Sequence, residues 1–272
     1  MSNLQKWTNK LATSWKNFRP PVRPSRAELD CFEKFLKIMI KSRGTNIKVL
    51  ILGSTPELRN LVSSKNLTVY VCDYNRKNFE ALKLLKKNEG KEILINQDWR
   101  RLKSNVKFDM IFAEASLNVV SKKDMELVFR SVRDHLNKGG LFVAKTWVQT
   151  KKQSVEKITE TYRKKYQQLY FYDAMAADLY SHFYNKKNQS LSLKELYWKL
   201  KKLHDSGKIT LKEFNSFSKL SYETTPLELY IPSIAEFKKM CSKYLQIMQI
   251  EYPKPIGTNK LPLFVMTTLK NR

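Results

Sequence analysis

A glycine and an aspartate in this chain have the spacing of a nucleotide-binding site. Gly53 follows an apolar run at residues 47–52, and Asp73 follows a second apolar run, at residues 67–72, twenty residues after Gly53. In strand–helix–strand units that bind nucleotides, an acidic side chain at this distance accepts hydrogen bonds from the ribose hydroxyls. A glycine lets the backbone approach the ligand because it has no Cβ. These two residues therefore predict a ribose-binding edge with Asp73 as the acceptor.

The residues after Gly53 have the composition of a helix start. Thr55 is a residue type that caps helices, and Pro56 suits a first turn, where a missing N–H group costs nothing. Glu57 would lie in that first turn, where the helix dipole favours a negative charge. Its carboxylate is therefore either a helix-stabilising charge or a ligand contact.

Strands and helices alternate over the first half of the sequence. Expected strands lie at residues 47–52, 67–72, 92–95, 108–113 and 141–148. Expected helices lie at residues 56–64, 75–87 and 122–136. This alternation predicts a doubly wound α/β sheet, which binds its ligands at the carboxyl ends of the strands. Four residues with suitable side chains follow the later strands: Asp98, Trp99, Glu114 and Asn118.

With these elements in order, the chain resembles the class I S-adenosylmethionine-dependent methyltransferases. The resemblance rests on the segments VLILGSTPEL, VYVCD, NQDW, FDMIFAEASLN and LNKGGLFVAKTW. It implies a Rossmann-like, seven-stranded, mostly parallel sheet. A helix at residues 232–244 and an antiparallel strand pair at residues 245–252 and 263–269 would complete that sheet. It also implies S-adenosylmethionine as the cofactor and methyl transfer as the reaction.

The resemblance assigns roles around the cofactor. Asp73 would accept from the ribose hydroxyls and Asp98 from the adenine amine, while Trp99 would stack on the adenine ring or fill the adjacent core. Either Glu57 or Glu114 would pair with the ammonium of the amino-acid tail. The predicted cofactor site consists of Gly53, Thr55, Glu57, Asp73, Asp98, Trp99, Glu114 and Asn118.

The resemblance divides the chain into three parts. Residues 1–46 form an N-terminal arm and helix, residues 47–150 and 226–272 form the core, and residues 151–225 form a helical insertion. We expect the insertion to cap the carboxyl ends of the strands, with its tyrosines lining an acceptor pocket. Ordinary packing of a helix on the sheet edge is the alternative explanation for its aromatic residues.

The insertion also holds the candidates for a general base. Asp173, Asp178 and His182 fall at helical spacings close to the aromatic residues. Methyl transfer needs little acid–base chemistry because the sulfonium is already an activated leaving group, so no catalytic residue is assigned. Further along, a capping pair at Ser192 and a glycine at Gly207 predict a helical hairpin.

The N-terminal arm combines aromatic residues with an extended, proline-rich stretch. Trp7, Trp15 and Phe18 share one predicted helix face, and the prolines that follow exclude a helix. The arm is either a lid whose Arg23 meets the cofactor carboxylate or an acidic substrate, or a clasp that buries the tryptophans. Ser25 is the expected cap of a helix over residues 26–40.

The charge is the second informative property of the sequence. The chain carries 51 basic and 25 acidic residues, a net charge of +26. Such a field attracts polyanions, although a composition rich in lysine, asparagine and isoleucine gives the same charge without any binding role. The acceptor is therefore a small molecule or a nucleic acid.

Composition also excludes several classes. No apolar run reaches the roughly 18 residues of a membrane span, and three scattered cysteines with three scattered histidines indicate neither a disulfide framework nor a metal site. We expect a cytoplasmic protein without a metal. Two other functions stay open: a non-catalytic cofactor-binding protein, because the loop has a single glycine, and a basic nucleic-acid-binding module.

Overall fold

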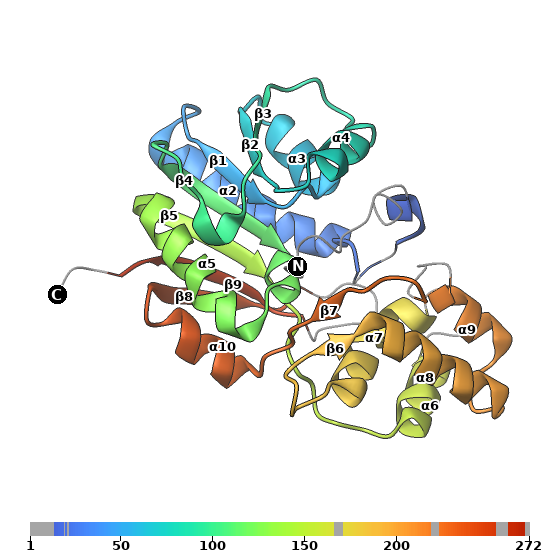
Figure 1. Cartoon of the computed structure of the whole chain (residues 1–272). Coiled ribbons are helices and arrows are strands. Elements are labelled where there is room, and N and C mark those ends of the chain that lie inside the picture. The colour runs from blue at the N-terminus through green and yellow to red at the C-terminus, as the bar shows by residue number, and fades with distance from the viewer. Residues whose placement is uncertain are drawn as a thin grey trace.

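The chain folds as a seven-stranded sheet between two layers of helices, with a helical insertion beside the carboxyl ends of the strands (Figure 1). The structure, a computed structural model, describes residues 14–18, 20, 22–165, 171–218, 223–253 and 261–269, and at residues 14, 17, 165, 171–175 and 216–218 it describes the backbone alone.

The sheet has the strand order β3-β2-β1-β4-β5-β9-β8. Its strands are β1 (Val49–Leu52), β2 (Val69–Cys72), β3 (Glu92–Ile95), β4 (Phe108–Glu114), β5 (Leu136–Lys145), β8 (Leu245–Glu251) and β9 (Leu263–Thr268). The first five strands pair in parallel, and β9 runs antiparallel to both of its neighbours, β5 and β8. This confirms the predicted doubly wound, mostly parallel sheet with an antiparallel pair at its end.

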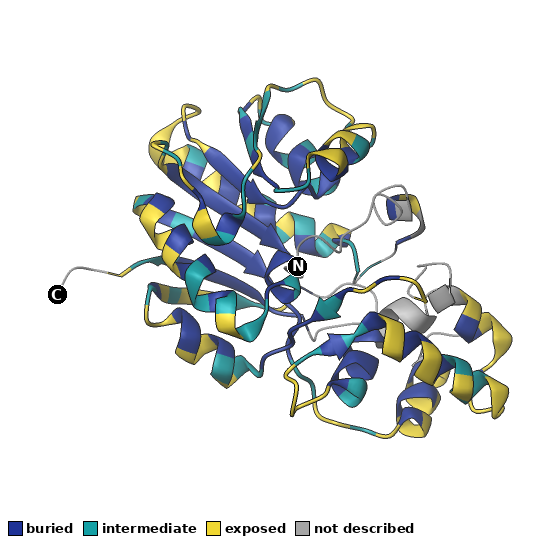
Figure 2. Ribbon diagram, in the orientation of Figure 1, coloured by how far each residue is buried: buried dark blue, intermediate teal, exposed yellow. Residues whose placement is uncertain are grey.

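Helices cover both faces because the central strand is apolar on both faces. In β1, Val49 and Ile51 pack in one cluster with the helices Arg26–Arg43 and Pro56–Ser63, whereas Leu50 and Leu52 pack in another with the helices Lys122–His135 and Ile234–Cys241. Figure 2 shows the central strands as the most continuous buried region. The helices of the core are α2 (Arg26–Arg43), α3 (Pro56–Ser63), α4 (Arg76–Lys83), α5 (Lys122–His135) and α10 (Ile234–Cys241).

The local expectations at the helix starts and at the fifth strand have different outcomes. Ser25 caps α2 as predicted, because its hydroxyl accepts from the Glu28 amide while the Glu28 carboxylate accepts from the Ser25 amide. Thr55 occupies the N-cap position of α3, but among the described residues its side chain accepts no capping hydrogen bond. The fifth strand, expected to begin at residue 141, begins at Leu136; within this earlier part the pairing register with β4 shifts and Gly139 has a φ of 70°.

The insertion forms a compact helical unit closed by two short strands. Its elements are α6 (Val155–Lys165), α7 (Phe171–Phe183), β6 (Leu191–Ser192), α8 (Leu193–Asp205), α9 (Leu211–Ser218) and β7 (Glu228–Leu229). The strands β6 and β7 pair with each other. The predicted hairpin is confirmed: Ser192 caps α8, Gly207 follows that helix with a φ of 73°, and Thr210 caps α9.

Asn118 joins both ends of the insertion to the core. Its Oδ1 accepts from the Trp147 amide (2.8 Å) and from the Thr146 hydroxyl (3.1 Å), while its Nδ2 donates to the carbonyls of Trp147 (3.0 Å) and Tyr230 (2.8 Å). An amide side chain has two acceptor and two donor positions, so these bonds use all of them. Asn118 therefore fixes the place where the chain leaves the core and returns to it.

We expect Asn118→Ala to lower the free energy of unfolding by at least about 2 kcal/mol, because it leaves several buried polar groups without partners. Urea denaturation measures this loss. Asn88→Ala, at an exposed asparagine with a single carbonyl partner, is the control and should stay within about 0.5 kcal/mol of the wild type. A loss for Asn118→Ala no larger than that of the control would contradict the structural role.

Candidate functional site

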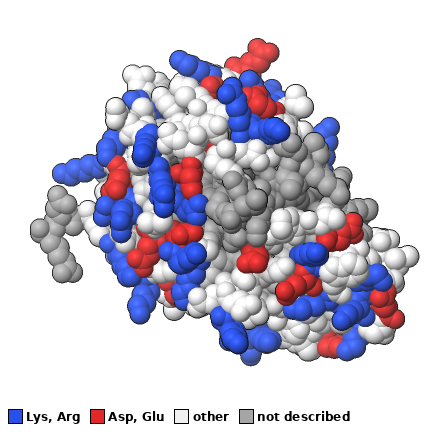
Figure 3. All heavy atoms as spheres, viewed as in Figure 1, with Lys and Arg blue, Asp and Glu red and all other residues white. Residues whose placement is uncertain are grey.

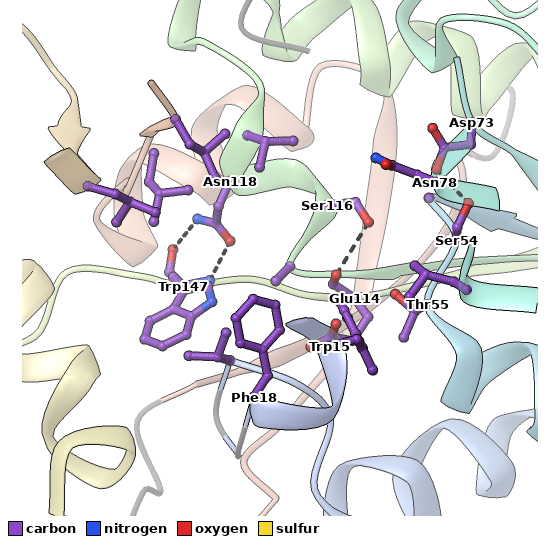
Figure 4. Close-up of a pocket in the computed structure, with 18 of the residues that line it drawn as sticks. Trp15, Phe18, Ser54, Thr55, Asp73, Asn78, Glu114, Ser116, Asn118 and Trp147 are labelled. Carbon is purple, nitrogen blue, oxygen red and sulfur yellow. Dashed lines mark hydrogen bonds between the residues drawn. The ribbon is translucent and has the colours of Figure 1, made fainter. Parts of the chain in front are cut away.

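A cavity opens where the carboxyl ends of the strands meet the arm and the insertion (Figure 4). Its free volume, open solvent included, is about 1030 Å³. Six of the eight predicted cofactor residues line it: Gly53, Thr55, Asp73, Trp99, Glu114 and Asn118. Glu57 and Asp98 do not contribute to this lining.

Gly53 lies in the loop after β1, where the backbone packs closely against Ser116 and Trp99. Its φ is 93°, and a Cβ added there would lie 3.2 Å from the Ser116 hydroxyl oxygen and 3.5 Å from the Trp99 ring. Both the backbone conformation and the close packing therefore require glycine. The loop and the Trp99 ring meet at this point on the cavity wall.

Asp73 is buried at one end of the cavity. One carboxylate oxygen accepts from the Ser54 hydroxyl (2.6 Å) and the other from the Asn75 amide (2.9 Å). Burial raises the pKa of Asp73, and the bond from Ser54 opposes that shift. A carboxylate accepts about four hydrogen bonds, so Asp73 has capacity for ligand hydroxyls.

The structure separates the two residues predicted to meet the adenine. Trp99 lines the cavity, but the Asp98 carboxylate caps the short helix Trp99–Arg101 and pairs with the Arg100 guanidinium (2.6 Å). Arg100 also pairs with Asp124 on α5 (2.7 Å). The contact between Asp98 and an adenine amine therefore stays a prediction, and it would compete with the pairing to Arg100.

The Tyr74 hydroxyl and the Trp99 Nε1 are buried atoms of cavity-lining residues that have no hydrogen-bond partner among the described residues. Buried polar groups are nearly always paired. Burial, with the charges of Asp73 and Asp98, raises the pKa of Tyr74 to about 12, so its hydroxyl keeps its proton at neutral pH. Both atoms are donors, which suits a ligand with acceptor atoms such as ring nitrogens or ribose oxygens.

Glu57 connects the arm to the start of α3. It accepts from Trp15 Nε1 (3.1 Å) and pairs with Arg23. Trp15 and Phe18 are buried and line the cavity. The arm thus both lines the cavity and buries its own aromatic residues, Trp15 and Phe18. Arg23 pairs with a carboxylate of the protein itself, Glu57. Trp7 lies outside the described residues.

A buried ion cluster closes the cavity floor. The Lys145 ammonium on β5 lies 2.9 Å from Glu114 Oε1 on β4 and 3.0 Å from Glu28 Oε1 on α2, and all three side chains are almost completely buried. Burial raises the pKa of Glu114 to about 7; Lys145 lowers it, while Glu28 and Glu57 raise it. For Lys145, burial lowers the pKa, but the two carboxylates raise it overall.

The candidate bases of the insertion have other partners. The Asp178 carboxylate accepts from the hydroxyls of Thr150 (2.7 Å) and Tyr162 (3.0 Å), and His182 Nδ1 lies 2.6 Å from the Gln153 carbonyl oxygen. Neither residue lines the cavity. The side chain of Asp173, and all of residues 166–170 with their two tyrosines, lie outside the described residues.

Sequence reasoning missed several cavity residues. Tyr180 is not among them, because the tyrosines of the insertion were expected at an acceptor pocket; its ring lies 4.7 Å from that of Trp147 between centroids. Leu193 of the insertion also lines the cavity and was not expected there. Three other cavity residues lie close in sequence to predicted ones: Ser54, Tyr74 and Ser116. The expectation that ligands bind at the carboxyl ends of the strands would have included them if it had been extended to neighbouring residues. The sequence does not distinguish Tyr180 from the other tyrosines of the insertion, because its position depends on how the insertion packs.

Over the part of the chain that the structure describes, no group of three or more histidine, cysteine or acidic side chains is placed to hold a metal ion. Within the same residues, every helix is too short or too polar to cross a membrane.

The fold resembles those of solved structures at low sequence identity. The methyltransferase CcbJ from Streptomyces caelestis superposes with a TM-score of 0.60 at 12% identity, over 97% of this chain and 98% of its own. The N-methyltransferase NodS from Bradyrhizobium japonicum, in complex with S-adenosyl-L-homocysteine, has a TM-score of 0.50 at 8% identity, over 97% of this chain and 100% of its own.

A third structure carries a different name. A Rhodobacter sphaeroides protein described as a zinc-dependent alcohol dehydrogenase has a TM-score of 0.57 at 12% identity, over 96% of this chain and 100% of its own. No protein-family model matches the sequence, and neither does any curated protein. The chain therefore has the class I methyltransferase fold, and the likeness shows the fold alone.

Glu114 makes the stability of the protein depend on pH. Its pKa is about 7 in the folded chain against a usual value of 4.5, so between these values the folded state binds more protons than the unfolded state. Its contribution to stability is therefore greatest at low pH and is lost as pH rises through about 7. We expect the unfolding free energy of the wild type, relative to that of Glu114→Gln, to fall as pH rises from about 5 to about 8. Urea denaturation of both proteins tests this, and parallel pH profiles would contradict it.

Proposed function

We propose that the protein binds S-adenosylmethionine in this cavity and transfers its methyl group to an acceptor. One observation carries the proposal. In a class I fold, the same cavity is lined by a buried carboxylate just after β2, Asp73, and by Tyr74 and Trp99, whose donors have no partner among the described residues. When bound, the cofactor supplies an electrophilic methyl group, and the electron pair of the carbon–sulfur bond stays on sulfur after transfer.

The residues of the cavity suit the parts of this cofactor. Asp73 accepts from the ribose hydroxyls, and Gly53 lets the loop backbone approach the ligand. Trp99 stacks on the adenine or donates to it through Nε1. Glu57 lies two residues after the cavity-lining Thr55, and its Oε2 is buried with no partner among the described residues. We propose Glu57 as the acceptor for the ammonium of the amino-acid tail.

The insertion supplies the acceptor side of the site in this proposal. Tyr180, Leu193 and Leu229 reach the cavity from the insertion, and Trp147 reaches it from the end of β5. Apolar and aromatic walls exclude water and orient an acceptor against the methyl group. The insertion, residues 151–225 with the adjoining β7, is therefore proposed to select the acceptor.

We expect S-adenosylmethionine to bind the wild type in calorimetry and Asp73→Asn to weaken this binding by about 1.5 to 3 kcal/mol, or roughly tenfold to 150-fold, because hydrogen bonds to a charged acceptor are lost. Asp205→Asn, at a carboxylate on α8 that pairs with Lys201, is the control and should bind as the wild type does. Since burial raises the pKa of Asp73 and ribose hydroxyls favour its ionised form, affinity should fall as pH falls through that pKa. Equal affinity of the Asp73 variant and the wild type would remove the ribose contact from the proposal.

A nucleic acid is the second candidate for the acceptor, and the net charge of +26 favours it. On the face in Figure 3, however, lysine and arginine side chains alternate with acidic ones rather than forming one continuous patch. Ion pairs such as Lys201–Asp205 and Lys208–Glu156 likewise place acidic side chains beside basic ones.

Salt dependence separates these possibilities. If the protein neutralises about three phosphates of a single-stranded RNA, its affinity should fall roughly tenfold or more between about 50 and 200 mM salt, because counterions are released. The affinity for S-adenosylmethionine is the internal control and should change less than about threefold. RNA binding that is weak and insensitive to salt would exclude a polyanionic acceptor.

A further inference from the structure

Glu114 is the carboxylate on the cavity wall that the proposed cofactor contacts leave without a role. It ends β4, lines the cavity and has its Oε1 held by Lys145. The residue after it, Ala115, adopts a left-handed conformation with a φ of 54°. The Glu114 side chain is therefore held by Lys145 of β5 at the carboxyl ends of the strands, where open α/β sheets bind ligands.

The charges that face Glu114 are Lys145 on β5, Glu28 on α2 and Glu57 on α3, and Glu57 itself pairs with Arg23. Fully ionised, the cluster of Glu28, Lys145 and Glu114 carries two negative charges and one positive charge. A residual charge in a buried cluster is costly, and one added proton removes it. Lys145 stays protonated because both carboxylates stabilise its charge, so a carboxylate takes that proton.

Glu114 is the member of the cluster that reaches the cavity. Among the described residues that line the cavity, the titratable side chains are Asp73, Tyr74, Glu114 and Tyr180. Asp73 is bound to Ser54 and Asn75 at the ribose end, and Tyr74 has a pKa of about 12. Glu114 changes its protonation near pH 7, and Lys145 leaves its second oxygen, Oε2, to carry the proton.

Resting on the function proposed above, we propose that Glu114 accepts the proton that the acceptor loses when it is methylated. The acceptor's bond to hydrogen breaks, a bond to the methyl carbon forms in its place, and the proton moves to Glu114 Oε2 before passing to solvent. The acceptor atom therefore carries a proton to lose, as in a hydroxyl or an amine. A thioether or a tertiary amine has no such proton and would leave Glu114 without a function.

The first test measures protons rather than turnover. Calorimetry near pH 7 in two buffers with different ionisation enthalpies gives the number of protons released on binding. S-adenosylmethionine carries a positive sulfonium and favours ionised Glu114, whereas S-adenosylhomocysteine is neutral at sulfur. We expect the wild type to release up to one proton more with the first ligand than with the second, and Glu114→Gln to show no difference. Glu126→Gln, at a carboxylate of α5 that pairs with Lys243 outside the cavity, should behave as the wild type does.

A second variant tests the cluster without touching Glu114. Glu28→Gln removes a nearby negative charge, keeps a side chain suited to the capping box with Ser25, and leaves Lys145 and Glu114 as a neutral pair. We expect the infrared band of protonated Glu114, identified by its absence in Glu114→Gln, to titrate at lower pH in Glu28→Gln. If the midpoint of this titration is at the same pH in Glu28→Gln as in the wild type, the proposal is wrong.

The third test measures the rate of methyl transfer. It uses an acceptor that the wild type methylates in an RNA, protein or metabolite pool. Glu114→Gln should then be at least about 100-fold slower, as for loss of a general base, with the affinity for S-adenosylmethionine changed less than about tenfold. Glu114→Gln leaves a neutral buried pair of Lys145 and Glu28, so the variant is expected to fold.

If the affinity of Glu114→Gln for both S-adenosylmethionine and S-adenosylhomocysteine collapses instead, Glu114 holds the ammonium and the proposal is wrong. If the wild type binds neither form, the proposed function fails; if it binds both without the proton difference, only this inference fails.

Discussion

The buried ammonium of Lys145 is the interaction on which the site depends. It contacts carboxylates from β4 and from α2, so it joins the sheet to the helix that precedes the first strand. An unpaired buried ion costs several kcal/mol, and α2 therefore cannot move away from the strand ends without exposing or orphaning a charge. The position of α2 in turn fixes Ser25 and the chain before it, which places Trp15 and Phe18 at the cavity.

The cavity has walls from three parts of the chain that are far apart in sequence. The core gives the loop after β1 and the strand ends, the arm gives Trp15 and Phe18, and the insertion gives Tyr180. Three polar interactions hold the neighbouring elements to the sheet: Lys145 holds α2, Glu57 holds the arm, and Asn118 holds the chain on both sides of the insertion. Apolar packing supplies most of the stability, while these polar contacts determine which surfaces face the ligand.

The parallel part of the sheet was predictable from the sequence because β1, β2 and β4 are apolar runs and a polar residue lies at or just after their carboxyl ends. Asp73 and Gly53 follow from that rule, since both sit directly after a strand in register with its neighbour. Charge pairing was not predictable. Asp98 turns to Arg100 because the short helix after β3 brings the guanidinium back to it, and Arg59 is buried against Glu92 although its helix looks polar on that side. The role of Asn118 was equally hidden, because its partners at Trp147 and Tyr230 meet only in three dimensions.

The strand order also has a consequence during synthesis. The strand β9, formed by residues 263–268, lies between β5 and β8, and Lys145 pairs with Leu263 only after the whole insertion has been made. At about 5 to 20 residues per second, the hydrogen-bonding edge of β5 therefore stays open for several seconds while the insertion leaves the ribosome. An open edge strand attracts other strands. Until β9 has been made and has paired with β5, this edge of the sheet is therefore open to pairing with another chain.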